Sequence, residues 1–311
     1  MKKILLFIFA LSFFGTVQAQ EEAIFNHYHI NPLLINPGTA GYDKANHKLF
    51  MNVRNSWAGF TGAPETYSIS YNGPVGKSLG IGAMIFTENI AALTRYRMQF
   101  SYAFRYDIKE VKMGIGMSTE FHRLRLANST TQSDFYDFGD DVIEDAIDGI
   151  RTFDASIGAY AELPEGTYIG VSLPNLIRNR LDEIAGVDGA SLFRYYLVNV
   201  GHKFDIAGKG VTLEPSFLIK KVRNVPFQFD ANLKASVLDE KLIGGLTART
   251  GHGGALGVLV GTKYKNFQLF YSYDAFMGDF QPYQSGSHEI TLSFQIERKK
   301  GKYDRSKKYR K

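Results

Sequence analysis

Apolar and polar side chains alternate with a period of two residues along most of the chain, which is the pattern of β-strands. Between residues 98 and 106 the even positions are Met, Phe or Tyr, whereas the odd positions are Gln, Ser, Ala and Arg. Residues 227–237, 267–274 and 290–296 alternate in the same way. Such a strand turns one face toward an apolar medium and the other toward a polar one.

These stretches predict about fourteen strands. Many are about 9–11 residues long, the length that a tilted strand needs to cross a lipid bilayer. After the first 19 residues no apolar stretch approaches about 18 residues, which excludes a helical membrane protein. The predicted strands cover residues 48–58, 65–72, 78–87, 94–106, 112–126, 152–163, 167–173, 193–204, 211–222, 225–237, 241–249, 255–264, 267–275 and 288–296.

The connections between the predicted strands alternate in length. Tight turns are expected at 73–77, 107–111, 164–166, 205–210, 238–240 and 265–266, and long connections at 127–151, 174–192 and 276–287. A short connection near Asn224 breaks the alternation. Outer-membrane barrels have short periplasmic turns and longer external loops. An even number of strands returns the chain to the periplasm.

Charged residues on the polar faces separate two all-β architectures. A secreted β-sandwich or propeller exposes its polar faces and buries its apolar ones. A transmembrane barrel turns its apolar faces to lipid and its polar faces to a wet lumen. Arg105, Glu120, Asp154, Asp230 and Asp274 all lie in the polar phase of their strands. The pattern favours an all-β, transmembrane antiparallel β-barrel of about 14 strands over a soluble β-protein.

The two ends of the chain differ from the alternating middle. Lys2 and Lys3, an apolar run and the small-residue site Val17-Gln18-Ala19 are typical of a secretory signal peptide. We expect a signal peptide at 1–19, an N-terminal Asn-Pro segment at 20–47, the barrel at 48–297 and a basic periplasmic tail at 298–311.

The Asn-Pro segment has two interpretations. Asn31-Pro32 and Asn36-Pro37 precede the first strand, and proline stiffens a segment while keeping it out of a central strand. In one interpretation this stiff stretch folds into the lumen as a plug. In the other it is a periplasmic lead-in to the barrel.

The formal net charge of +5 belongs to the two ends rather than to the barrel. The tail RKKGKYDRSKKYRK contributes +8 and the two signal lysines contribute +2, which leaves −5 for the body. The body therefore gives no indication of nucleic-acid binding. The tail is either a solvated end or an electrostatic contact with an acidic partner.

Candidate chemistry is scarce. The absence of cysteine excludes disulfides and cysteine nucleophiles, and there is no Gly-x-Ser-x-Gly, His-Glu-x-x-His or phosphate-binding glycine loop. His27 and His29 have no clustered ligand partners in sequence, and the acidic stretch 137–148 lacks the spacing of a calcium loop. We therefore expect no enzyme activity, no cofactor and no metal.

Motifs spread over most of the chain carry a family resemblance. Asn31-Pro32 and Asn36-Pro37 form an opening of two Asn-Pro dipeptides. Residues 54–66, RNSWAGFTGAPET, form a hairpin motif that contains Arg54, Trp57, Phe60 and Pro64 and the one tryptophan of the chain. Later strands carry motifs that contain Asp154, Asp230, Asp274, His288 and Glu289. In these features the chain resembles the PorP/SprF family of type IX secretion system outer-membrane proteins from the Bacteroidota.

The resemblance implies a role in protein export across the outer membrane or in surface display. Family members assist type IX secretion, some as general components and others as partners of one adhesin, and gliding motility is among the associated processes. The partners implied are secretion machinery proteins, a secreted adhesin and outer-membrane lipid, with no nucleic acid and no small-molecule substrate. The implied location is the outer membrane, reached through the Sec pathway, with both termini periplasmic.

The resemblance carries over no catalytic residue, and it presents the motif residues as barrel and plug architecture. A passive or ligand-gated channel for small molecules is the alternative function, because charged lumen faces are compatible with it. A lipid-modifying barrel enzyme is a third class, and it lacks a nucleophile and base at any suggestive spacing.

Overall fold

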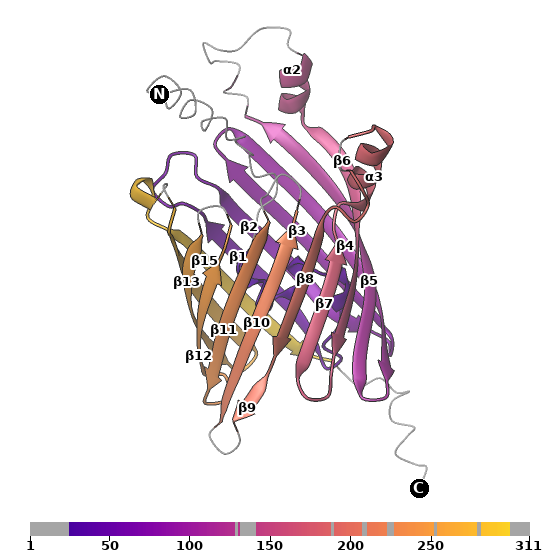
Figure 1. Cartoon of the computed structure of the whole chain (residues 1–311), viewed down its shortest axis with the longest axis vertical. Coiled ribbons are helices and arrows are strands. Elements are labelled where there is room, and N and C mark those ends of the chain that lie inside the picture. Colours follow the sequence, from indigo (N-terminus) through magenta and orange to yellow (C-terminus); the bar gives the residue numbers. More distant parts are fainter. Residues whose placement is uncertain are drawn as a thin grey trace, which may run out of the picture.

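The strands form one antiparallel sheet that closes into a barrel (Figure 1). The computed structural model describes residues 25–127, 130, 141–187, 190–206, 210–222, 227–251, 254–278 and 281–298. The strands are β1 (Asn46–Asn55), β2 (Glu65–Val75), β3 (Leu79–Ile90), β4 (Leu93–Ile108), β5 (Val111–Leu126), β6 (Ile150–Glu162), β7 (Thr167–Leu173), β8 (Tyr196–His202), β9 (Phe204–Ile206), β10 (Val211–Lys221), β11 (Gln228–Val237), β12 (Leu242–Arg249), β13 (Ala255–Tyr264), β14 (Phe267–Phe276) and β15 (Ser287–Glu297). The helices are η1 (His27–His29), η2 (Pro32–Leu34), η3 (Pro37–Thr39), α2 (Asp141–Asp148), α3 (Leu176–Ile184) and η5 (Gln281–Tyr283).

The barrel closes because β15 pairs with β1 and β10 pairs with β11. Strands β8 and β9 both pair with β10 in one continuous register, and only Lys203 separates them. They therefore form a single interrupted strand, and fourteen strands surround the lumen among the described residues. The predicted barrel of about 14 strands is confirmed.

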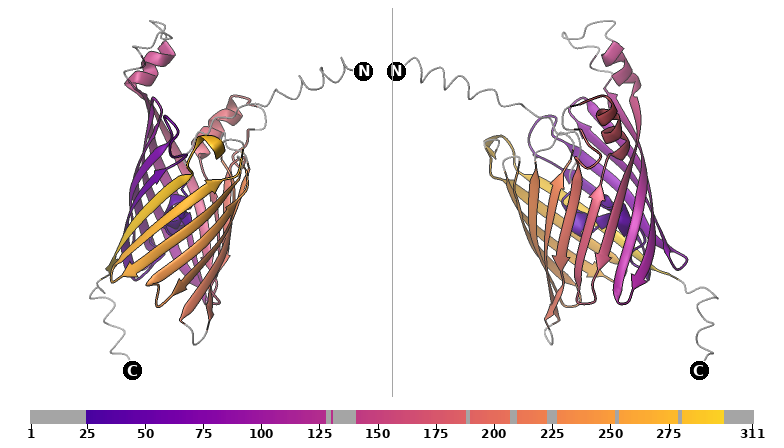
Figure 2. Two further views of the ribbon diagram at one scale, coloured as in Figure 1. Left: turned by 90° about the vertical axis from the view of Figure 1, so that its left-hand side faces the viewer. Right: turned by 45° about the vertical axis from the view of Figure 1, so that its right-hand side comes forward.

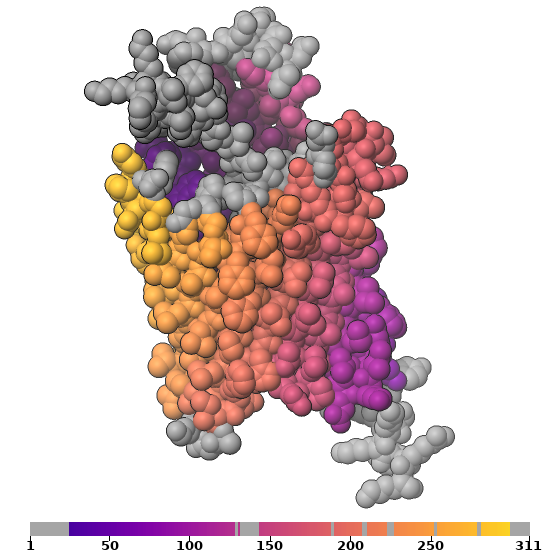
Figure 3. Space-filling view, viewed as in Figure 1, coloured from indigo at the N-terminus to yellow at the C-terminus, as the bar shows by residue number. Residues whose placement is uncertain are grey.

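Inward and outward side chains follow the alternation of the sequence. On β4, Gln99, Ser101 and Arg105 are buried inside the barrel, whereas Phe100 and Phe104 are 52% and 58% exposed. Figure 3 shows the outer wall as a continuous surface of side chains. A soluble sandwich would reverse this arrangement, so the outward apolar belt identifies a wall that faces lipid.

The two rims of the barrel differ in their connections. At the short-turn end the chain reverses within a few residues, at 76–78, 109–110, 163–166, 238–241 and 265–266. The opposite rim, here called the loop end, carries α2, α3 and η5 (Figure 1). The β3–β4 connection at the loop end is short as well, because it consists of Ala91 and Ala92 alone.

Some local details differ from the sequence-based expectation. The first strand ends at Asn55 instead of residue 58, because Trp57 has a positive φ of 56° and the chain leaves the sheet there. Helices α2 and α3 lie within the long connections predicted at 127–151 and 174–192, and they were not predicted because a search for period-two alternation does not detect short helices. Among the described residues, no helix is both long and apolar enough to span a membrane.

Residues 25–41 lie inside the barrel, where Figure 2 shows the indigo coils of η1 to η3 behind the wall. Phe25 packs on the inward ring of Phe86 with ring centroids 5.5 Å apart. At the other end of the segment, the Arg105 guanidinium donates to the carbonyl oxygen of Gly41 near the short-turn end. The segment therefore enters from the loop-end side and descends through the lumen before β1 begins.

Some predicted features lie outside the described residues. These are the signal peptide at 1–19, the tail beyond Arg298, both chain termini with their predicted periplasmic location, the first part of the acidic stretch at 137–140 and the connection near Asn224.

Candidate functional site

A row of inward-facing glycines receives the N-terminal segment. A Cβ on Gly116 would lie 2.5 Å from the carbonyl oxygen of Pro37, and one on Gly82 would lie 2.7 Å from Leu33 Cδ2. These approaches are possible because glycine has no side chain. We call the row the glycine cradle: Gly80, Gly82, Gly114, Gly116 and Gly158 on β3, β5 and β6.

The two Asn-Pro dipeptides begin the helices that lie on the cradle. Pro32 and Pro37 occupy the first turn of η2 and η3, where their missing N–H has no intrahelical partner to lose. The Asn36 side chain accepts from a backbone N–H of η3 at 2.8 Å and donates to a carbonyl oxygen of β6 at 2.9 Å. Asn31 Nδ2 donates to Ser70 Oγ at 2.9 Å. Each asparagine thus ties the segment to the wall.

Glu289 is the main acceptor for the start of the segment. Its carboxylate accepts from the backbone N–H groups of Asn26 at 2.9 Å and His27 at 3.1 Å. It also accepts from Asn52 Nδ2 at 2.8 Å and from Arg54 Nη1 at 3.0 Å. Glu289 is fully buried, so these donors compensate the desolvation of its charge.

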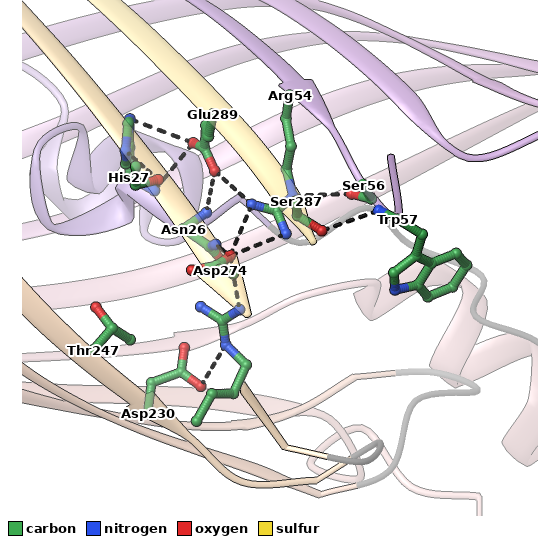
Figure 4. A network of polar contacts seen from close by, with 12 residues as sticks. Asn26, His27, Arg54, Ser56, Trp57, Asp230, Thr247, Asp274, Ser287 and Glu289 are labelled. Carbon is green, nitrogen blue, oxygen red and sulfur yellow. Dashed lines mark hydrogen bonds and ion pairs between the residues drawn. The ribbon is translucent and has the colours of Figure 1, made fainter. Parts of the chain in front are cut away.

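Further buried charges extend this cluster across the lumen (Figure 4). Arg54 contacts Asp274 at 3.4 Å, and Arg249 Nη1 lies 3.6 Å from the same carboxylate. Arg249 Nε donates to Asp230 at 3.1 Å, and Lys220 Nζ lies 3.6 Å from Asp230. The three cations and three carboxylates balance in formal charge. We call the set the rim network: Arg54, Lys220, Asp230, Arg249, Asp274 and Glu289.

The histidines of η1 are held without charge. His27 Nδ1 lies 2.7 Å from Thr291 Oγ1 and Nε2 lies 2.9 Å from Ser272 Oγ, an arrangement that a neutral imidazole satisfies by donating once and accepting once. Burial lowers the pKa of His27, and it lowers the pKa of His29 to about 3, with the charge of Lys234 acting in the same direction. Neutral histidines therefore lie beside the balanced network at ordinary pH.

Beyond Arg54, which lies in the lumen, the hairpin motif continues as a loop at the loop end of the barrel. The backbone N–H of Trp57 donates to Ser287 Oγ at 3.1 Å, and the Trp57 ring meets Phe276 edge-on at 6.3 Å. The carbonyl oxygen of Pro64 accepts from the N–H of Ser56 at 2.9 Å and closes the loop. Phe60 is 43% exposed at its tip. This hairpin presents an aromatic side chain outward.

Asp154 and His288 lie away from the rim network. Asp154 on β6 accepts from the backbone N–H of Ile177 at 3.0 Å and so anchors the first turn of α3. His288 is turned away from the lumen, with Nδ1 2.8 Å from the hydroxyl of Tyr271. The structure thus brings Arg54, Asp230, Asp274 and Glu289 together, and it separates them from these two residues.

The sequence analysis did not identify Arg249 or the glycine cradle. Arg249 connects Asp230 with Asp274, and the glycine cradle receives the segment. A signal for the cradle is present, because Gly-Ile-Gly occurs at 80–82 and again at 114–116 in the inward phase of two strands. Among the described residues, no group of three or more His, Asp or Glu side chains is arranged to hold a metal ion.

Comparison with a protein family decides the identity of this barrel. The family described as "Type IX secretion system membrane protein PorP/SprF" matches residues 17–294. The chain belongs to the PorP/SprF family. The matched region of this PorP/SprF chain includes both Asn-Pro dipeptides, the glycine cradle and the rim network. The protein is therefore an outer-membrane β-barrel of type IX secretion.

Solved structures share the fold of this PorP/SprF chain. The toluene transporter TbuX of Ralstonia pickettii is 10% identical with a TM-score of 0.50, over 85% of this chain and 92% of that one. The "TodX deltaS2S3 mutant monoaromatic hydrocarbon channel" is 9% identical with a TM-score of 0.50, over 89% and 95%. Acinetobacter baumannii Omp33 is 8% identical with a TM-score of 0.47, over 81% and 99%. A comparison with curated proteins found no match.

Proposed function

We propose that the protein supports the export or surface anchoring of an adhesin or another secreted protein by binding protein partners. The observation that carries this proposal is membership of a type IX secretion family over residues 17–294. In this proposal the chain is exported through the Sec pathway, its short turns face the periplasm, and its apolar belt contacts outer-membrane lipid. The protein binds its partners in this proposal and catalyses no reaction.

The occupied lumen supports a binding role. Residues 25–41 lie within the barrel, and hydrogen bonds of their backbone and side chains tie them to strands on both sides. We propose that this segment acts as a plug that closes the lumen. A partner then meets the protein at a rim instead of passing through the barrel.

The loop end supplies surface for such a partner. Helix α3 and the residues after it expose large apolar side chains, among them Leu181 at 60%, Ile184 at 68% and Phe193 at 68%. Phe60 adds an exposed aromatic ring from the hairpin loop. Large apolar groups exposed outside the lipid belt are typical of protein-binding surfaces.

Deletion of the gene tests the function. We expect the loss of one or more secreted proteins from the cell surface and medium, measured by quantitative proteomics, and recovery when the wild-type gene is restored. Deletion of an unrelated outer-membrane barrel serves as the control for general envelope damage. Unchanged export and surface display in the deletion strain would contradict the proposal.

A further inference from the structure

A cavity lies at the loop end, on the side of the lumen away from Glu289. Its volume is about 270 Å³, close to the lower limit of about 300 Å³ for ligand pockets. The lining comes from the upper parts of β3, β4, β5 and β6 and from the start of α3. We call it the loop-end chamber.

The chamber has an excess of positive charge. Among the residues that the structure describes, four guanidinium groups and two carboxylates line it: Arg95, Arg97, Arg123 and Arg178, and Glu88 and Asp154. A third carboxylate, Glu120, lies 3.4 Å from the lining residue His122. The rim network, by contrast, balances its charges. A surplus of one sign along a cleft raises the local potential and attracts groups of the opposite sign.

Contacts within the wall orient the arginines of the chamber. Arg95 Nη1 lies 3.1 Å from Glu88, and the Arg97 guanidinium lies 5.0 Å from the centroid of the Phe86 ring. Arg123 Nη2 donates to a backbone carbonyl oxygen at 2.9 Å. A guanidinium carries five N–H donors in a rigid plane, so Arg95 and Arg123 keep donors beyond these contacts. Arginines that are already oriented lose little freedom when they bind an anion.

We propose that the loop-end chamber binds an acidic peptide segment of the exported partner. Arginine clusters recognise carboxylates by paired hydrogen bonds. The lining also includes Phe86, Leu124 and Ile150, which provide apolar contact for the aliphatic and aromatic side chains of a peptide. The chamber lies inside the barrel, away from the lipid-facing wall. This inference rests on the proposed function, since the peptide belongs to the partner.

Peptide binding to the purified full-length protein in detergent tests the inference. The probe is a fluorescein-labelled peptide with the sequence Glu-Phe-Asp-Leu-Glu, and its control is the neutral peptide Gln-Phe-Asn-Leu-Gln. We expect saturable binding of the acidic peptide, at least tenfold tighter than the control and weakened by salt. Equal binding of the two peptides would overturn the inference.

Substitutions locate the binding. Arg97→Gln and Arg178→Gln should each weaken acidic-peptide binding about tenfold, the effect of losing one charged hydrogen-bond partner. Arg97→Lys should retain part of the affinity and shows that the wall still folds. Arg180→Gln is the matched control, because Arg180 lies on the same helix and pairs with Glu183 on the exposed side. An equal loss in the Arg180 variant would overturn the assignment to the chamber.

Dextran sulfate separates a peptide site from a general polyanion site. Arginine-dependent binding of dextran sulfate without binding of the acidic peptide would overturn the peptide assignment. Peptide binding to the purified protein tests whether the chamber is a binding site, whereas export by the deletion strain tests the proposed function. Absent peptide binding together with an export defect in the deletion strain would therefore overturn the chamber alone.

Discussion

At the scale of single residues, Glu289 joins the wall to the N-terminal segment. It is fully buried and faces Arg54 and two backbone N–H groups, so its charge is matched within the protein and not by water. Removing one partner of such a buried pair leaves the other charge unmatched. This is more damaging than loss of an exposed ion pair.

Glu289→Gln should lower the free energy of unfolding by about 3–5 kcal/mol, because Arg54 loses a buried counter-charge. Thermal unfolding followed by circular dichroism in detergent measures the effect. Glu240→Gln is the control, since Glu240 pairs with Lys263 near the protein surface, where a pair contributes about 0–1 kcal/mol. Equal melting temperatures for the Glu289 variant and the wild type would contradict the role of the network.

Lowering the pH from 7 to 5 should destabilise the folded protein. His29 has a pKa of about 3 in the fold and about 6.5 when unfolded, so below pH 6.5 the unfolded chain takes up a proton that the folded chain does not. The His29 side chain is only partly buried, although its Nδ1 is buried without a hydrogen-bond partner among the described residues. We therefore expect the free energy of unfolding to fall by about 1–2 kcal/mol at pH 5. Unfolding free energies measured at both pH values check the loss. His29→Gln should reduce it, and an unchanged pH dependence in that variant would refute the assignment.

At the scale of elements, the short helices of residues 25–41 pack closely on strands β3, β5 and β6. This is possible because the strands present glycines, which have no side chain, at the contact. The backbone of the segment approaches Gly114 and Gly116 so closely that its carbonyl oxygens occupy the places of side chains. A wall built from larger inward residues would hold the segment away, and the asparagine contacts to β2 and β6 would not form.

Gly80→Ala and Gly158→Ala should each destabilise the protein by about 1–3 kcal/mol through overpacking against the segment. At Gly80 the added Cβ would clash with the carbonyl oxygen of Ala40, and at Gly158 with the side chain of Asn36. Thermal unfolding measures the change. Gly244→Ala is the matched control, since its Cβ would have no atom within 4 Å.

Displacement of the segment gives a second measurement on the same variants. The chain contains no cysteine, so Leu34→Cys introduces a single reporter thiol. Its reaction with a maleimide should be faster in the Gly80 and Gly158 variants than in the Gly244 variant. Equal rates in all three would mean that the glycines do not hold the segment.

At the scale of the whole molecule, the barrel combines a lipid-facing wall with a lumen that contains part of its own chain. The apolar outer belt and the polar lumen both follow from the alternation of apolar and polar residues, because successive side chains of a strand point to opposite faces. In the proposed function, the occupied lumen distinguishes this barrel from an open channel.

The wild-type protein in planar lipid bilayers should show no steady conductance. Deletion of residues 25–41 should produce it, because the polar inner faces of the strands then line a water-filled path. Circular dichroism of the deletion variant checks that the barrel still folds. Steady conductance of the wild type would contradict the plug and favour the alternative of a small-molecule channel.

Much of the architecture was predictable from local patterns. The strand at 167–173 and the strand at 255–264 have the predicted bounds, because alternation and turn residues act within a few positions. The end of β1 could not be predicted from local patterns, because the positive φ of Trp57 belongs to a loop that is hydrogen-bonded to Ser287 far along the chain. Helix α3 depends in the same way on Asp154, which anchors its first turn from β6.

The chain alone specifies a fourteen-strand wall with an apolar outside and a polar inside, because the partition between lipid and water acts on each residue in turn. Which charged side chains meet inside the lumen depends on the closure of the barrel. Arg54 and Glu289 are 235 residues apart and become neighbours when β15 pairs with β1. The course of residues 25–41 likewise depends on glycines of three strands facing one space, a juxtaposition that no local pattern contains.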